Sequence, residues 1–263
     1  MNKKLLFPAI LIVLAAMVLA GVFYWLKKPA SNIVYTSTPT PTRSPANGQL
    51  PLLENEVATS TSYHVAGEIS RGNPDKKQII FTFDTGAGTN SAQKILEVAK
   101  QHNVTVTFFS TGKFAEKNPE LIKQISTAGH EIFNHTYSHP YLTKITDEQI
   151  KEELEKADEI ISGLTGQITK PYFRPPYGDR NAHVLAVAGN LGWQSVYWTT
   201  DALDWETGKT ADEVKARIYS HLQNGAIFLM HAGDDITGQV LNEIFTYMES
   251  QDYKIVSLSE GLK

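Results

Sequence analysis

Short apolar segments alternate with helical patterns along most of this 263-residue chain. The apolar segments are rich in β-branched and aromatic residues and occupy positions 79–83, 104–109, 130–134, 171–175, 194–200, 226–231 and 253–259. Segments this short, apolar on both faces, are typical of strands buried in a parallel sheet that helices cover. The pattern therefore predicts an α/β domain with about seven parallel strands and outer helices. A distorted (β/α) barrel suits that number, and a doubly wound open sheet is the alternative.

Two of the helical segments carry a capping pattern that fixes where they begin. Thr146 with Gln149, and Thr210 with Glu213, have the spacing of a capping box, in which each side chain accepts a hydrogen bond at the helix start. The second helix is expected to close at Gly225, because glycine favours helix ends.

The N-terminal region predicts export from the cytoplasm. Residues 5–26 are 22 residues without a charge, flanked by lysine pairs. A helix of that length, at about 1.5 Å per residue, crosses a bilayer core of about 30 Å. We interpret residues 1–28 as a membrane anchor, or as a cleaved signal segment, and the Pro-, Ser- and Thr-rich residues 29–64 as a linker. The folded domain, residues 65–263, is then extracellular on a single-pass protein, or secreted if the segment is cleaved.

Composition excludes several classes of site and partner. The chain has no cysteine, which excludes disulfides, thiolate metal sites and a cysteine nucleophile. Its net charge is −4 and no basic run occurs, so nucleic acid is not an expected partner.

Ionisable residues follow five of the predicted strands, and in a barrel all these strand ends open on one face. One such residue is usually structural, but a set drawn from five strands is hard to explain by structure alone. The set comprises Asp84, His135, His139, Arg174, Asp201, Asp204 and His231.

Each of these motifs has a structural interpretation when it is taken alone. In "HTYSH", a helical turn would place the imidazoles of His135 and His139 on one side, about 6 Å apart and suited to one metal, but the spacing also arises by chance. Asp84 alone would be a turn residue. His231 alone is as well explained as a core histidine, and Arg174 before two prolines as a surface residue on a rigid loop.

The segment "FDTGAGTNSA" competes as a dinucleotide-binding loop. Gly86 and Gly88 match the first two glycines of that motif, but Ala92 stands one place late for the third. No acid follows about 20 residues on, and no lysine follows for a phosphate loop. We therefore expect no nucleotide cofactor.

Taken in order, the motifs "TFD", "HTYSH", "RPPYG", "DALDW" and "LMH" resemble those of the polysaccharide deacetylase family, the NodB-homology domains of carbohydrate esterase family 4. The resemblance covers residues 84–231 and implies a distorted (β/α) barrel. It implies that Asp84 is the general base that activates water, oriented by Arg174. The amide of Tyr177 would hold the oxyanion. His231 would protonate the leaving amine, with Asp204 raising its pKa.

The resemblance also implies a divalent metal, zinc or else cobalt, nickel or manganese, bound by His135 and His139. Most members of the family have a second Asp as third ligand where this chain has Thr85. Because a neutral hydroxyl is a poor ligand, Thr85 predicts weaker metal binding, unless Asp234 or Asp235 takes its place.

The implied reaction is hydrolysis of an N-acetyl group on a polysaccharide hexosamine. Residues expected to bind the substrate are Pro175, Tyr177, Trp198 and Leu229. The predicted anchor and linker favour cell-wall peptidoglycan, or another N-acetylglucosamine-containing glycan, as the partner of a monomeric enzyme. Two alternatives remain: a non-catalytic glycan-binding pseudoenzyme, which Thr85 motivates, and an O-deacetylase of acetylated xylan-type glycans.

Overall fold

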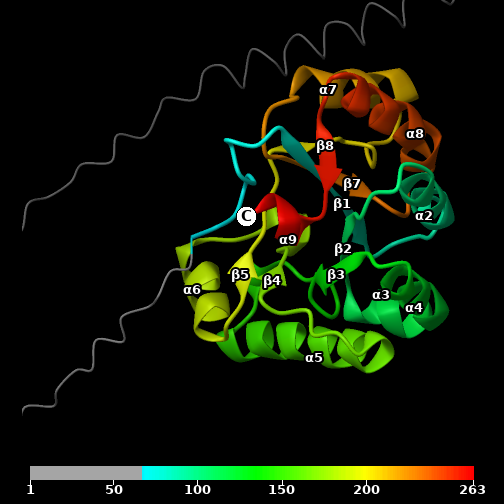
Figure 1. Ribbon diagram of the computed structural model, residues 1–263. Helices are drawn as coiled ribbons and strands as arrows, with labels where there is room; N and C mark the ends of the chain where they lie inside the picture. The colour runs from blue at the N-terminus through cyan, green and yellow to red at the C-terminus, as the bar shows by residue number, and fades with distance from the viewer. Residues whose placement is uncertain (1–66) are drawn as a thin grey trace, which may run out of the picture. The chain divides into compact units, whose positions relative to one another are not determined.

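The computed structural model describes residues 67–263, and the predicted anchor and linker lie outside this range. No helix within it combines the length and apolarity needed to cross a membrane. In the described residues, eight parallel strands form one curled sheet with the larger helices on its outside (Figure 1). This confirms the predicted distorted barrel and its parallel strands. The strands are β1 (Gln78–Thr85), β2 (Thr107–Ser110), β3 (Glu131–Asn134), β4 (Tyr172–Phe173), β5 (Gln194–Ser195), β6 (Thr200–Asp201), β7 (Ala226–His231) and β8 (Lys254–Val256).

The strand order is β5-β4-β3-β2-β1-β7-β6, and β8 pairs with the first half of β1. The central strand β1 is therefore hydrogen-bonded to β2, β7 and β8. Its register sets Asp84 beside His231 of β7. Two of the ionisable residues thus lie on neighbouring strands at the same level.

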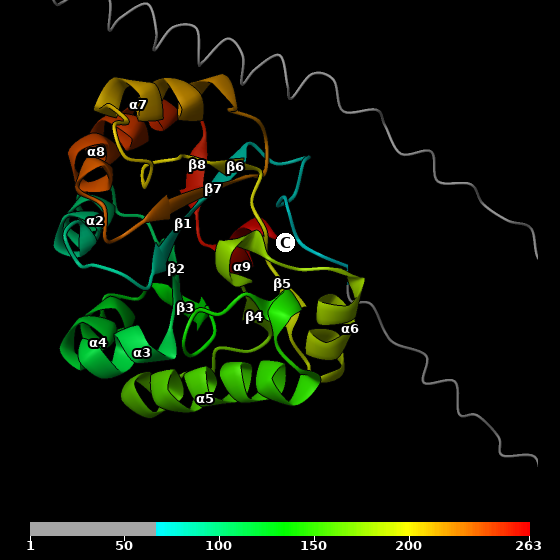
Figure 2. The same cartoon turned by 180° about the vertical axis from the view of Figure 1, so that it is seen from behind.

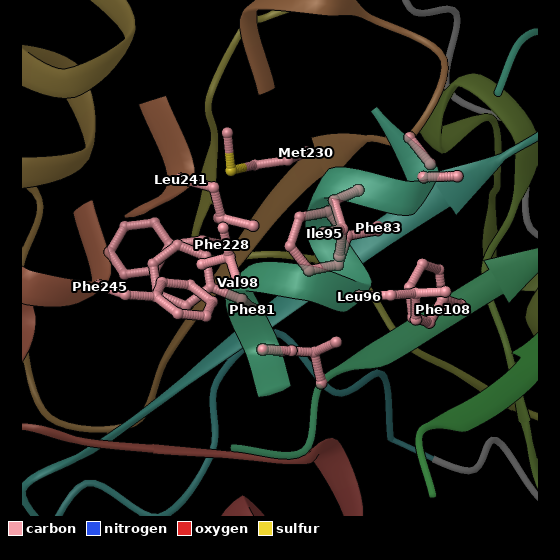
Figure 3. Packing of buried hydrophobic residues seen from close by; sticks show 14 of the residues in the cluster. Phe81, Phe83, Ile95, Leu96, Val98, Phe108, Phe228, Met230, Leu241 and Phe245 are labelled. Carbon is pink, nitrogen blue, oxygen red and sulfur yellow. The ribbon is translucent and has the colours of Figure 1, made fainter. Parts of the chain in front are cut away.

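Side-chain alternation along β1 separates two apolar layers. Phe81 and Phe83 face the helices, and the ring centroids of Phe81 and Phe228 lie 5.1 Å apart (Figure 3). Ile80 belongs to the smaller cluster inside the barrel, with Phe109 and other buried residues. Asp84 continues the inward-facing row of Ile80, which places a carboxylate at the end of the barrel interior.

The helices begin where the capping patterns predicted. Thr146 and Thr210 each accept a hydrogen bond from the backbone of the third helical residue, and the reciprocal contact is present in both. The second of these helices ends at Ser220, however, and not at Gly225 as predicted. The helices are α2 (Ala92–Gln101), α3 (Gly112–Lys117), α4 (Pro119–Thr127), α5 (Asp147–Thr165), α6 (Ala182–Asn190), α7 (Ala211–Ser220), α8 (Asp235–Ser250) and α9 (Leu258–Gly261), with short 3-10 turns η1 (Leu142–Lys144) and η2 (Pro176–Gly178).

The apolar run 194–200 is not the single strand that was predicted. It forms β5 and β6, which lie at opposite edges of the sheet, so residues 196–199 cross the seam between these edges. Ile69 lies along this seam: its N–H donates to Ser195 (2.9 Å), and its carbonyl accepts from Tyr197 (2.7 Å). The beginning of the described chain therefore helps to close the barrel.

The last helix, α9, lies inside the ring of strands and helices (Figure 2). The N–H of Leu258 donates to the hydroxyl of Thr107 (2.9 Å), and the hydroxyl of Ser257 donates to the carboxylate of Glu131 (2.8 Å). Since Thr107 and Glu131 are the first residues of β2 and β3, α9 closes the amino-terminal end of the barrel. The carboxyl ends of the strands are left for the site.

Gly225 makes a close approach that only glycine allows. Its φ is +69°, and a Cβ there would lie 2.7 Å from the carbonyl oxygen of Gly72. We expect Gly225→Ala to lower the free energy of unfolding by about 1–3 kcal/mol. Gly163→Ala is the matched control, because Gly163 lies in α5 with open space around it, and should raise that energy by about 0.4–1 kcal/mol. Urea unfolding of the two variants checks this, and equal midpoints would contradict it.

Candidate active site

A cavity of about 540 Å³ opens at the carboxyl ends of the strands. Eight of the residues predicted for the site line it: Asp84, His135, His139, Pro175, Tyr177, Trp198, Leu229 and His231. Arg174, Asp204 and Thr85 are buried and are not part of its lining. The structure therefore gathers residues from β1 and β7 and from the segments that follow β3, β4 and β5.

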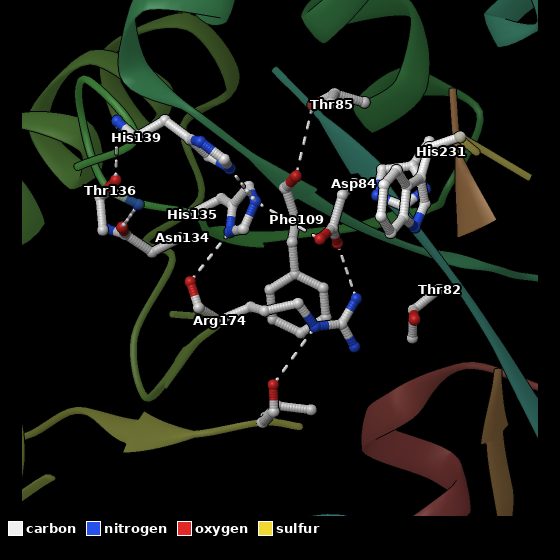
Figure 4. A network of polar contacts seen from close by, with 12 residues as sticks. Thr82, Asp84, Thr85, Phe109, Asn134, His135, Thr136, His139, Arg174 and His231 are labelled. Carbon is white, nitrogen blue, oxygen red and sulfur yellow. Dashed lines mark hydrogen bonds and ion pairs between the residues drawn. The ribbon is translucent and has the colours of Figure 1, made fainter. Parts of the chain in front are cut away.

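A buried ion pair forms the floor of the site (Figure 4). Nη1 of Arg174 donates to Oδ1 of Asp84 at 2.7 Å, and the guanidinium lies 4.0 Å from the ring centroid of Phe109. Burial raises the pKa of Asp84, but the charge and hydrogen bond of Arg174, with a contribution from the charge of His231, outweigh it and lower that pKa overall. Asp84 is therefore ionised at neutral pH, as a general base must be.

His135 is held in one tautomer by the backbone. Its Nδ1 lies 2.9 Å from the carbonyl oxygen of Arg174, which can only accept, so Nδ1 carries the proton. The Nε2 lone pair then faces the cavity, 3.1 Å from Nε2 of His139 and 3.3 Å from Oδ2 of Asp84. A carbonyl that fixes the ring in this way is the usual support of a metal-binding histidine.

The prediction that "HTYSH" forms a helical turn is wrong. The segment is a loop in which Thr136 and His139 have φ values of +66° and +65°. Asn134 and Glu153 stabilise it: the Asn134 side chain accepts from the Thr136 N–H (2.8 Å), and Glu153 accepts from the N–H and hydroxyl of Ser138 (2.6 Å each). This loop places the ring centroids of His135 and His139 4.8 Å apart, closer than the spacing of about 6 Å expected on a helix.

The two histidines fit a divalent metal. Zinc binds imidazole nitrogen at about 2.0–2.1 Å, so two tetrahedral ligand atoms lie roughly 3.3 Å apart, close to the 3.1 Å seen here. Burial lowers the pKa of both rings, and for His139 burial followed by the neighbouring His135 lowers it to about 4. Both rings are then neutral, as ligands must be. The Thr85 hydroxyl instead lies 3.4 Å from the Phe109 carbonyl, to which it donates.

A second charged pair lies beside Asp84. Nδ1 of His231 is 2.9 Å from Oδ1 of Asp204, and Oδ2 of Asp204 accepts from the His231 N–H and from the Thr237 hydroxyl. Burial lowers the pKa of His231, but the hydrogen bond and charge of Asp204, with smaller contributions from Asp84 and Asp201, raise it to about 9. His231 is therefore a cation at neutral pH and can donate a proton.

Asp234 lies with His231 and not with the histidine pair. One ligand atom each from Asp204, His231 and Asp234 lies within 4.8 Å of the others. The hydrogen bonds of Asp204 to His231 explain the closeness of these two residues, and a protonated His231 repels a cation. The suggestion that Asp234 could replace Thr85 as a third ligand beside His135 and His139 therefore finds no support in this geometry.

The remaining predicted residues form the walls of the cavity. Tyr177 has a φ of +58°, and its N–H has no hydrogen-bond partner within residues 67–263, so it is free to donate to a substrate. Trp198 stacks on Tyr197 with centroids 3.7 Å apart, and Leu229 is buried beside the opening. A Cβ on Gly178 would lie 3.0 Å from the Trp198 ring, which explains the glycine of "RPPYG".

Several residues of the site carried no clear sequence signal. Trp205 lines the cavity and donates from Nε1 to Asp201 (3.3 Å), although tryptophan is usually a core residue. The loops after β1 and β7 meet at Gly88 and Gly233, where a Cβ on Gly233 would lie 2.7 Å from the Gly88 nitrogen. This contact depends on the pairing of β1 with β7, which cannot be read from the sequence alone.

The fold and this arrangement of residues define a deacetylase of the carbohydrate esterase type. The family model described as polysaccharide deacetylase matches residues 71–196. Peptidoglycan-N-acetylmuramic acid deacetylase PdaA of Bacillus subtilis is 36% identical over 193 residues, covering 72% of this chain and 73% of that protein. The chain belongs to the polysaccharide deacetylase family, and the resemblance predicted from the motifs is confirmed.

Two further relatives are a named deacetylase and a pseudoenzyme. A peptidoglycan-N-acetylglucosamine deacetylase of Bacillus cereus is 35% identical over 191 residues, covering 71% of this chain and 69% of that protein. The crystal structure of BA3943, described as a CE4 family pseudoenzyme from Bacillus anthracis, has a TM-score of 0.71 at 31% identity, covering 75% of this chain and 69% of that one. A mutant of BA3943 is described as having restored activity.

Metal binding by the histidine pair can be measured without any substrate. We expect His139→Ala to weaken Zn²⁺ binding at least tenfold. Loss of a residue that only orients a metal ligand typically costs about 10- to 100-fold in affinity, and this variant removes a ligand itself. His183→Ala, at an exposed histidine outside the cavity, is the matched control. Thr85→Asp should strengthen binding by adding a charged oxygen at the end of β1. Isothermal titration checks all three, and unchanged affinity in His139→Ala would contradict this assignment.

Proposed function

We propose that this protein hydrolyses N-acetyl groups on the hexosamines of a cell-wall glycan. The observation that carries the proposal is the pairing of an ionised Asp84 with a protonated His231 on adjacent strands at one cavity. Hydrolysis of an amide needs both a base for the water and an acid for the amine. The names of the Bacillus relatives, which act on muramic acid or glucosamine residues of peptidoglycan, support this substrate class.

The residues supply the steps as follows. Asp84 accepts a proton from water as the water oxygen bonds to the acetamide carbon, and the carbonyl oxygen becomes an oxyanion. The free N–H of Tyr177 donates to that oxyanion. His231 then gives its proton to the nitrogen, the C–N bond breaks, and acetate and a free amine leave. Arg174 keeps Asp84 ionised and fixes its direction.

His135 and His139 would hold a divalent metal. When bound, it would polarise the acetamide carbonyl and acidify the water, which supplies a nucleophile near neutral pH. The neutral state of both rings keeps their lone pairs available for this role.

We also propose that the domain acts outside the cell membrane. The support is the charge-free segment 5–26 followed by the Pro-, Ser- and Thr-rich residues 29–64. An enzyme held at the outer membrane face by an extended linker reaches peptidoglycan first.

Acetate release tests the proposed activity. With Zn²⁺, Co²⁺, Ni²⁺ or Mn²⁺, the full-length protein should release acetate from N-acetylglucosamine oligomers and from peptidoglycan fragments. Asp84→Asn should lower kcat by about 10²–10⁴, because it removes the base. Asp252→Asn makes the same chemical change at an exposed aspartate and should leave kcat unchanged. A wild type that releases no acetate with any metal, beside a working deacetylase, would refute the activity.

A non-catalytic glycan-binding role is the second candidate, and Thr85 together with the BA3943 pseudoenzyme favours it. It predicts that the wild type binds the same oligomers but that Asp84→Asn changes no phenotype. The intact His231–Asp204 pair argues against it, because binding alone needs no buried acid. Comparison of N-acetyl with O-acetyl substrates separates the esterase alternative.

The pH profile reports on His231. The acidic groups around it are Asp204 after β6, Asp201 on β6, Asp84 on β1 and Asp234 after β7. Because the acid must be protonated, activity should hold as pH rises and then fall through about 9. Asp204→Asn removes the main charge that raises this pKa, so the alkaline limb should move down by about one to two pH units. An alkaline limb that does not move in kcat against pH would contradict the role of this pair.

A further inference from the structure

Large apolar side chains that remain exposed gather around the cavity. Among residues 67–263, four are exposed: Tyr141, Tyr177, Trp205 and Ile168. Tyr177 and Trp205 line the cavity, and Tyr141 stacks on Tyr177 with centroids 4.2 Å apart and planes 15° apart. Ile168 precedes β4 and so belongs to the opposite, amino-terminal end of the strands. Exposed apolar surface concentrated at a site marks a ligand contact.

The tyrosine pair continues directly from the reacting centre. The ring of Tyr177 lies 4.4 Å from that of His139, at 70°, so three rings form a row that leads outward from the cavity. Tyr177 covers one face of Tyr141, yet Tyr141 is 53% exposed. The other face of Tyr141 is therefore open to solvent.

The loops that carry the two rings are braced against each other. Asp179, just after η2, accepts from the N–H (2.8 Å) and the hydroxyl (2.9 Å) of Thr143, in η1. Tyr177 also has its φ of +58°, which is uncommon for a large side chain and persists where the surroundings enforce it. The rings are thus set in position before any ligand binds, which lowers the entropy lost on binding.

We propose that Tyr141 and Tyr177 form a stacking subsite for the sugar next to the one that is deacetylated. This inference rests on the proposed function. A pyranose ring has an apolar C–H face and polar edges, and tyrosine offers an apolar face with a hydroxyl at its edge. The sugar's face packs on the open face of Tyr141, and its hydroxyls reach the phenol groups. The site therefore selects a glycan chain over a free N-acetylhexosamine.

Binding of defined oligomers tests the subsite apart from catalysis. The full-length His231→Asn protein, which slows turnover, is titrated with N-acetylglucosamine and with its β-1,4-linked tetramer. Tyr141→Ala in this background should weaken tetramer binding about three- to tenfold, the effect of losing one aromatic contact. The loss should be clearly smaller for the monosaccharide. Tyr141→Phe and Tyr141→Trp keep the flat face and should restore most of the tetramer affinity.

Ile168→Ala is the matched control, since it removes an exposed apolar side chain at the other end of the barrel. Equal unfolding midpoints show that the variants are folded. The subsite is overturned if Tyr141→Ala binds the tetramer as the parent does, or if it loses equal affinity for both ligands.

Steady-state acetate release by the Tyr141→Ala single variant is a second test of the subsite. KM for the tetramer should rise by the same factor while kcat changes less, because the ring touches a sugar that does not react. If the wild type binds the tetramer through Tyr141 but releases no acetate, the proposed activity fails and the subsite stands. If it releases acetate and Tyr141→Ala does so with unchanged KM, only the subsite fails.

Discussion

The site depends on one buried residue, Arg174. Its guanidinium is fully buried and paired with Asp84, and its backbone carbonyl fixes the tautomer of His135. A buried ion pair contributes little net stability, but removal of one partner costs about 3–5 kcal/mol because a charge is left unpaired. Arg174 thus links the ionisation of the base to the orientation of the first histidine. Its side chain also donates to the carbonyl of Val196, which connects Asp84 and His135 through Arg174 to the barrel seam.

The same arrangement separates two kinds of histidine within one cavity. His135 and His139 lie near an arginine and near each other, where burial keeps them neutral. His231 lies against Asp204, whose carboxylate also accepts from the His231 N–H and the Thr237 hydroxyl, and stays charged. Ligand and acid are therefore distinguished by their neighbours and not by residue type, since all three are histidines. Asp84 lies between the two kinds of histidine: its carboxylate is 3.3 Å from Nε2 of His135, and its charge helps to raise the pKa of His231.

The sequence predicted the parallel strands, the helix starts and the set of ionisable residues, because each depends on local pattern. Apolar runs mark buried strands, and Thr146 and Thr210 carry capping boxes. What failed depended on contacts distant in the chain. The run 194–200 has no glycine, proline or charged residue, so nothing local divides it between the two sheet edges. Asn134 and the surrounding fold impose the left-handed conformation of Thr136, which a β-branched residue disfavours. Thr237 and Tyr141 have no sequence signal of their own, and only their contacts with Asp204 and Tyr177 in the folded protein place them at the site.

The meeting of Gly88 and Gly233 has a consequence for how this site can change over evolution. The loop after β1 leaves no room for a side chain on Gly233, and a Cβ on Gly88 would lie only 3.2 Å from Gly233, so a larger residue at either position requires the other loop to move. The rim above β1 and β7 is a fixed boundary. Tyr141, Tyr177 and Trp205 are exposed side chains on other loops, so substitutions there change what the cavity offers a substrate without a backbone clash. Substrate preference is therefore expected to change more readily at these exposed side chains than at the two glycines.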